Sequence, residues 1–157
     1  ALRKLESNED FEGFAKSTYH IANEYFHIAD HCLTILVQNP AAVLSIAAFS
    51  CELFLKSIIY WTVHKKCYKN GKNGAEEHDL LNLFKMLPIE IANKIKELHP
   101  CSNTKKEKFE IELSNIRKAF TILRYISEHS SMACNMMFIL ELLASLKSVC
   151  DDLLSDK

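Results

Sequence analysis

Glycine and proline are so scarce in this chain that they restrict it to a mainly helical fold. Its 157 residues contain three of each. A β-rich fold needs a turn about every ten residues, and turns depend on these two residue types. The breaks that do occur are far apart: "QNP" at 38–40, "KNGKNG" at 69–74 and Pro88. Their spacing predicts long helices joined by few connections.

Helical periodicity between these breaks predicts four long helices and a short helical insert. The long segments are 8–38, 41–66, 105–128 and 132–154, and two short ones, "HDLLNLFKML" and "PIEIANKIKEL", follow the second. Asn8 is the predicted N-cap of the first. The segment 41–66 is apolar nearly all round, as is typical of a helix at the centre of a bundle. We therefore expect one all-α domain over residues 1–157, an up-and-down bundle of four long helices with a short two-helix insert.

Charge and cysteine content narrow the classes of function. The formal net charge is −1 and the pI about 6.7, so any binding to nucleic acid must come from a local patch. The six cysteines are irregularly spaced without a C-x-x-C pair, which indicates free thiols in a reducing cytoplasm rather than disulfides or a zinc site. We expect no metal and no cofactor. The most apolar run is interrupted by two charges, which favours a core helix over a membrane span.

Those two charges, Glu52 and Lys56, lie four residues apart on one face of the apolar helix. At a surface, such a pair contributes roughly a few tenths of a kcal/mol. This helix has little surface, and a buried charge needs a partner. Two interpretations stay open: a surface ion pair, or an internal polar site completed by another helix. If the charges are buried, we expect Arg124 or Arg117 to reach Glu52.

His78 is a further candidate, at the start of the first short helix. It either belongs to the same polar site or, with Asp79, only satisfies the free backbone amides of that helix.

A polar stripe runs along the predicted helix 105–128. Its members follow one another at spacings of three and four, so they would share one face of a continuous helix. A solvated face would look the same, but this stripe contains no lysine. Arginine is the better residue where a planar, bidentate grip on phosphate or carboxylate is needed. The members are Glu110, Ser114, Arg117, Thr121, Arg124 and Glu128.

Arg124 and His129 stand near the end of this helix, in "TILRYISEHSS". In a continuous helix the two side chains would diverge by about 140°. They converge only if the helix ends or bends near residues 127–130, which the two serines permit. A converged pair could cleave RNA, because histidine exchanges protons near neutral pH and arginine stabilises charge developing on phosphate. The alternative is that both are solvated residues at a helix end.

Three stretches in order resemble the HEPN family of helical bundles. They are "AAFSCELFLKSIIY" at 47–60, "HDLLNLFKMLP" at 78–88 and "IRKAFTILRYISEH" at 116–129. The resemblance implies a bundle of four or five helices, often dimeric. The family includes metal-independent RNases of toxin–antitoxin and phage-defence systems, whose signature is an arginine and a histidine four to six residues apart. Only Arg124 and His129 match that signature, while Glu52, Lys56 and His78 match recurrent family positions.

The resemblance leaves two hypotheses of different classes. The first is an RNA-directed protein: a small metal-independent endoribonuclease that acts as a homodimer through Arg124 and His129, or an inactive relative that binds single-stranded RNA or a nucleotide. Other members carry an arginine–tyrosine pair followed by glutamate, as in "RYISE" here, without a demonstrated catalytic histidine; for those the resemblance implies binding of a nucleotide, RNA or a protein partner. The second is a protein-binding module, such as an immunity protein or antitoxin component, with a toxin, antitoxin or nucleotidyltransferase as partner. Arg117 and Glu128 would support the polar site in either case.

Overall fold

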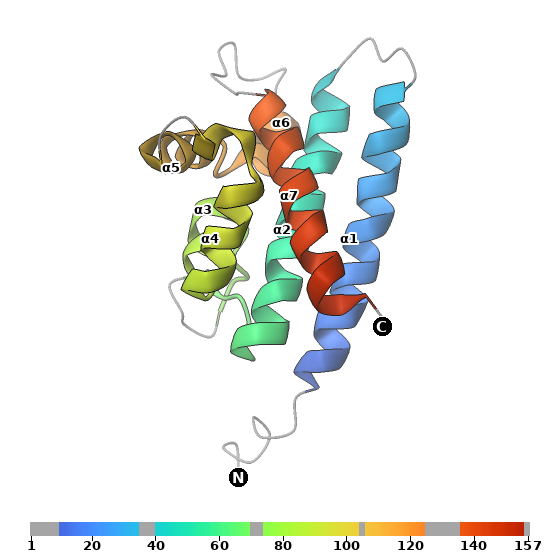
Figure 1. The fold of residues 1–157 in the computed structure, drawn as a ribbon. Coiled ribbons are helices and arrows are strands. Elements are labelled where there is room, and N and C mark those ends of the chain that lie inside the picture. The colour runs from blue at the N-terminus through green and yellow to red at the C-terminus, as the bar shows by residue number, and fades with distance from the viewer. Residues whose placement is uncertain (1–9, 35–39, 70–73, 104–105, 125–135, 156–157) are drawn as a thin grey trace.

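A computed structural model describes residues 10–34, 40–69, 74–103, 106–124 and 136–155, and these residues form an all-α bundle without a named strand (Figure 1). The predicted all-α class is confirmed, but three long helices are described where four were predicted. Three long helices, α1, α2 and α7, are packed together, and the shorter ones lie to one side of them. The elements are α1 (Phe11–Thr34), α2 (Pro40–Val63), α3 (Leu80–Lys85), α4 (Ile89–Leu98), the 3₁₀ helix η4 (Pro100–Asn103), α5 (Lys106–Asn115), α6 (Ala119–Arg124) and α7 (Met136–Leu154).

Helix α2 occupies the centre, as its all-round apolar sequence predicts. Helices α1, α6 and α7 all pack against it, and Cys51, Phe54 and Ile58 on it are fully buried. The helix is long and apolar enough to cross a membrane by length and composition, but 72% of its apolar window is buried inside the protein. That burial is what a core helix shows.

The closest packing is between α1 and α2. Helix α1 turns alanines at intervals of seven residues towards the core: Ala15, Ala22 and Ala29 are all buried. Small side chains let two helices approach closely, and the hydroxyl of Ser50 donates to the carbonyl oxygen of Ala22 at 2.8 Å. The two longest helices are therefore joined by backbone proximity as well as by side-chain contact.

The helix ends differ in detail from the prediction. Asp10 caps α1, since its carboxylate accepts from the N–H of Gly13 at 2.8 Å, whereas Asn8 lies outside the described residues. Helix α2 ends at Val63 instead of residue 66. The next residue, His64, has φ 53°, the left-handed conformation that terminates helices.

The predicted long helix 105–128 is not continuous. It is divided into α5 and α6 by a turn at residues 116–118, so the polar stripe from Glu110 to Arg124 does not share one helix face. The physical reason lies elsewhere in the chain. The carbonyl oxygen of Arg117 accepts from the N–H of Leu80 at 2.8 Å, and inside a continuous helix that oxygen would be used by the helix itself.

His99, which the sequence did not single out, joins α4 to α7 while fully buried. Its Nδ1 accepts from the N–H of Cys101 at 3.1 Å, so the ring proton is on Nε2, 3.3 Å from the carbonyl oxygen of Phe138. Burial lowers the pKa of His99 below its ordinary 6.5, although the contact with Phe138 and the carboxylate of Glu141 act the other way. The imidazole is therefore neutral in the folded protein.

This geometry predicts a pH-dependent contribution to stability. Because the pKa is lower in the folded than in the unfolded chain, the unfolded chain binds the proton more readily, and the contribution is lost as the pH falls below about 6.5. His99→Leu should be less stable than wild type near neutral pH but should lack this titration. We expect the difference in unfolding free energy between the two, from urea denaturation, to shrink between about pH 7.5 and 5.5. A difference that stays constant would contradict a buried neutral imidazole.

Candidate polar site and cationic cleft

Glu52 and Lys56 are both buried, at 1% and 5% exposure, so they are not a surface ion pair, and their further partners come from the segment 76–79 and not from another helix. Lys56 Nζ lies 3.0 Å from Glu52 Oε1. The same oxygen is 2.8 Å from Nδ1 of His78, and Lys56 Nζ also lies 3.4 Å from Glu76 Oε2. Glu52 Oε2 is buried and has no hydrogen-bond partner among the residues that the structure describes. Two contacts therefore connect α2 to the segment 76–79, one from Glu52 to His78 and one from Lys56 to Glu76.

Of the two arginines expected to reach Glu52, Arg117 has other partners. Arg117 Nε donates to Asp79 Oδ2 at 2.7 Å, and Arg117 Nη2 donates to Asn82 Oδ1 at 3.3 Å. The turn that separates α5 from α6 directs Arg117 to the start of α3 instead of to α2. Arg124 ends α6, but its side chain, like all of Glu128 and His129, lies outside what the structure describes.

The segment from Glu76 to Asp79, which we call the strap, follows a short hairpin. The hairpin is held by two backbone hydrogen bonds, Lys69 N–H to Ala75 O at 3.0 Å and Glu77 N–H to Cys67 O at 2.7 Å. Side chains of extended backbone alternate between two faces, and the strap follows this rule. Its even residues turn to α2, where they meet Lys56 and Glu52, and its odd residues turn to α3 and Arg117.

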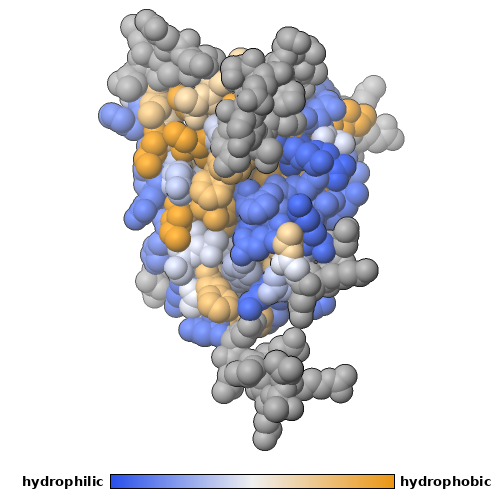
Figure 2. Space-filling model, turned by 180° about the vertical axis from the view of Figure 1, so that it is seen from behind, coloured by the Kyte–Doolittle hydropathy of each residue, from blue (hydrophilic) through white to orange (hydrophobic). Residues whose placement is uncertain are grey.

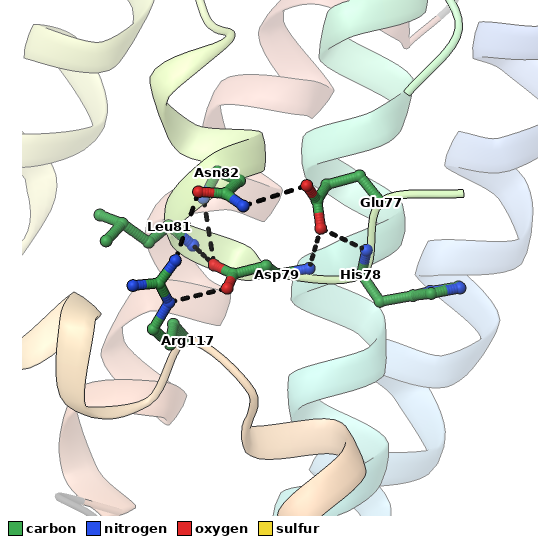
Figure 3. A network of polar contacts seen from close by, with 6 residues as sticks. All are labelled: Glu77, His78, Asp79, Leu81, Asn82 and Arg117. Atoms are coloured by element: carbon green, nitrogen blue, oxygen red, sulfur yellow. Dashed lines mark hydrogen bonds and ion pairs between the residues drawn. The ribbon is translucent and has the colours of Figure 1, made fainter. Parts of the chain in front are cut away.

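The odd residues of the strap organise the start of α3 (Figure 3). Asp79 is the N-cap: its Oδ1 accepts from the N–H groups of Leu81 and Asn82 at 3.1 and 3.2 Å. Glu77 Oε1 accepts from the N–H groups of His78 and Asp79, both at 3.0 Å, and Glu77 Oε2 accepts from Asn82 Nδ2 at 3.0 Å. Both carboxylates are thus buried and saturated by hydrogen bonds. Asp79 provides the cap, and the side chain of His78 belongs to the polar site.

A cleft of about 710 Å³ opens beside this network. We call it the Arg117 cleft. Its exposed charges are positive: Lys69 and Lys118 are exposed and the Arg117 side chain is 39% exposed, whereas the two carboxylates are buried. Seven residues line it: Lys69, Glu77, His78, Asp79, Asn82, Arg117 and Lys118. The rim of the cleft is cationic, and the two carboxylates beneath it already accept hydrogen bonds from within the protein. This arrangement suits an anionic ligand.

The Arg117 cleft does not present a histidine–arginine catalytic pair. In Figure 3 the imidazole of His78 points away from the guanidinium of Arg117, and its Nδ1 is engaged by Glu52. Burial raises the pKa of the Cys67 and Cys150 thiols to about 12, so neither of these two thiols is an activated nucleophile. Within the described ranges, no three histidine, cysteine or acidic side chains are grouped to hold a metal ion.

Sequence reasoning found only some of this site. Glu52, Lys56 and His78 come together as one cluster, and Arg117 belongs to the neighbouring one. The strap itself was missed, although its signal is visible in the sequence. Four consecutive polar residues, "EEHD" at 76–79, lie between a loop and a helix, and their alternation matches two faces.

A scan against protein-family models, a search of curated proteins and a search of solved structures each found no match to this chain. Its function is therefore inferred from its own residues.

Removing the carboxylate of Glu52 should deprive the buried ammonium of Lys56 of its closer and buried partner, leaving the exposed carboxylate of Glu76 at 3.4 Å. We expect Glu52→Ala to lower the unfolding free energy by about 3 kcal/mol, the scale for breaking a buried ion pair. The matched control is Glu110→Ala, because Glu110 forms a comparably short ion pair with Lys96 (2.7 Å) but is 64% exposed. The control should cost less than about 1 kcal/mol. Equal losses for the two variants in urea denaturation would show that burial of the Glu52 pair has no energetic consequence.

Proposed function

We propose that this chain is an RNA-directed protein of the HEPN type that binds single-stranded RNA through the Arg117 cleft. The observation that carries the proposal is the cationic rim of Arg117, Lys69 and Lys118 above two carboxylates that are buried and saturated. A strand of RNA offers one phosphate per nucleotide, and local cationic grooves bind such strands without a basic protein overall. This fits a chain whose formal net charge is −1.

The guanidinium of Arg117 is held in one orientation, which favours binding of a phosphate. Asp79 holds its Nε and Asn82 holds its Nη2, so the planar group is fixed before a ligand arrives. A fixed guanidinium loses little conformational entropy on binding a phosphate and grips it through parallel hydrogen bonds. Lys69 and Lys118 would add two flexible point charges on either side.

We propose that Arg124 and His129 cleave the bound RNA. Helix α6 begins directly after Lys118 and ends at Arg124, so its six residues lead away from the cleft over about 9 Å. His129 would activate the 2′-hydroxyl of the bound strand, and Arg124 would stabilise the charge on the scissile phosphate. A homodimer would bring two such pairs together. The biological setting that we propose is a toxin or phage-defence system.

A protein-binding module is the second candidate, and a surface feature favours it. Three large apolar side chains on α1, Phe14, Ile21 and Ile28, recur every seven residues and are 42–47% exposed. Figure 2 shows hydrophobic side chains along the side of the molecule where α1 lies. Exposed apolar patches of this kind mark contacts with other proteins. A toxin, an antitoxin, a nucleotidyltransferase or a second copy of this chain would be the partner.

Charge reversal on the rim tests RNA binding. We expect the double variant Lys69→Glu, Lys118→Glu to bind a fluorescently labelled single-stranded RNA at least about tenfold more weakly, with a shallower dependence on salt, because each lysine neutralises a phosphate. The control is Lys108→Glu, an exposed lysine on α5 that does not line the cleft. Fluorescence anisotropy at several salt concentrations measures both quantities.

The outcomes separate the two candidates. Equal affinity of wild type and the rim variant would end the proposal for the cleft. Incubation of the same preparations with RNA in EDTA tests cleavage, which should fall at least about a hundredfold in His129→Ala. If wild type neither binds nor cuts RNA, while Ile21→Glu abolishes an association between protein chains, the protein-binding module is the function.

A further inference from the structure

A second, smaller pocket lies on the other face of the hairpin that borders the Arg117 cleft. It has a volume of about 280 Å³, and we call it the aromatic pocket. Three rings line it, Phe14 from α1, Tyr60 from α2 and Tyr68 from the hairpin. Polar groups of Thr18, Lys66 and Glu76 lie among them. The pocket is just below the size range of typical small-molecule sites, roughly 300 Å³ and above, which suits one ring system.

The hairpin places the two sites back to back. Tyr68 and Glu76 form its antiparallel bridge, so their side chains are on one face, and both line the aromatic pocket. Lys69 and Glu77 are the next residues on each side, so they belong to the opposite face, and both line the Arg117 cleft. A ligand that passes over the hairpin would meet cationic groups on one side and aromatic rings on the other.

We propose that the aromatic pocket binds a nucleobase, guanine in preference to the others, of the same RNA strand whose phosphate the Arg117 cleft holds. This inference rests on the proposed RNA binding. Sequence-tolerant binding of single strands uses aromatic side chains on which bases stack, and unstacked bases are recognised through their hydrogen-bonding edges.

The polar groups at the rings select the kind of base. Glu76 is 66% exposed and its carboxylate is an acceptor, while the ammonium of Lys66 is a donor. Guanine presents two adjacent N–H donors next to a carbonyl acceptor, which matches an acceptor beside a donor. An organic cation would be favoured by the rings and by Glu76, but it would be repelled by Lys66.

Part of each of the three rings is accessible to a ligand. Phe14 and Tyr60 have centroids 6.2 Å apart and planes inclined by 61°, so they meet edge to face and do not stack on each other. Phe14 is 42% exposed, and Tyr60 and Tyr68 are half-buried. A base inserted beside Tyr68 would cover apolar surface that the protein alone leaves in contact with water.

The test compares a short single-stranded RNA containing one guanosine with the same RNA carrying an abasic residue or inosine in its place. Tyr68→Ala should lower the affinity for the guanosine RNA at least about tenfold, the scale of one stacked base. It should leave the affinity for the abasic RNA unchanged, and Tyr68→Phe should behave as wild type. Inosine lacks the 2-amino donor, so wild type should bind the inosine RNA more weakly than the guanosine RNA. Glu76→Met, which has no strong acceptor at this position, should bind the two RNAs equally.

A matched control keeps the result interpretable. Tyr25→Ala also removes a half-buried ring, one that packs against Phe49 outside the pocket, and it should not change the affinity for either RNA. If wild type binds no RNA, the proposed function itself is wrong. If wild type binds RNA but Tyr68→Ala loses the same factor on abasic and guanosine RNA, or none on either, RNA binding stands and the nucleobase pocket is wrong.

Discussion

The buried ion pair of Glu52 and Lys56 is the constraint on which the rest of the structure depends. The two charges sit on the central helix α2, where helices alone would leave them without enough polar partners. The even face of the strap supplies those partners through Glu76 and His78. The need for these polar partners explains why a hairpin and an extended segment interrupt the helices beside Glu52 and Lys56.

The odd residues of the strap connect the buried ion pair to the Arg117 cleft. Once its even residues are fixed on α2, Asp79 is placed to cap α3 and to hold Arg117. Arg117 in turn gives its carbonyl oxygen to Leu80, which ends α5 and lets α6 turn back onto α2. The Arg117 cleft and the aromatic pocket therefore lie on the two faces of the same hairpin and strap. The first role of the strap is to supply polar partners for Glu52 and Lys56.

The sequence predicted those features that depend on local pattern. Scarce glycine and proline predicted an all-α fold, and the all-round apolar run predicted the central position of α2, but the sequence left open whether Glu52 and Lys56 are buried. The break at residues 116–118 could not be predicted, because the periodicity of 105–128 is uninterrupted and the cause is Leu80, distant in the chain. For the same reason sequence could not choose Asp79 over Glu52 as the partner of Arg117. The roles of Arg124 and His129 stay predictions.

Hydrogen exchange of individual amides in the double variant Glu52→Leu, Lys56→Met tests the central role of the buried pair most directly. Replacing a buried ion pair by apolar residues of similar size can leave global stability unchanged, so exchange in α7 should not change. The amides of His78 and Asp79, which donate to Glu77, and those of Leu81 and Asn82, which donate to Asp79, should exchange faster. Unchanged protection of these four amides would contradict the claim that the pair on α2 holds the strap in place.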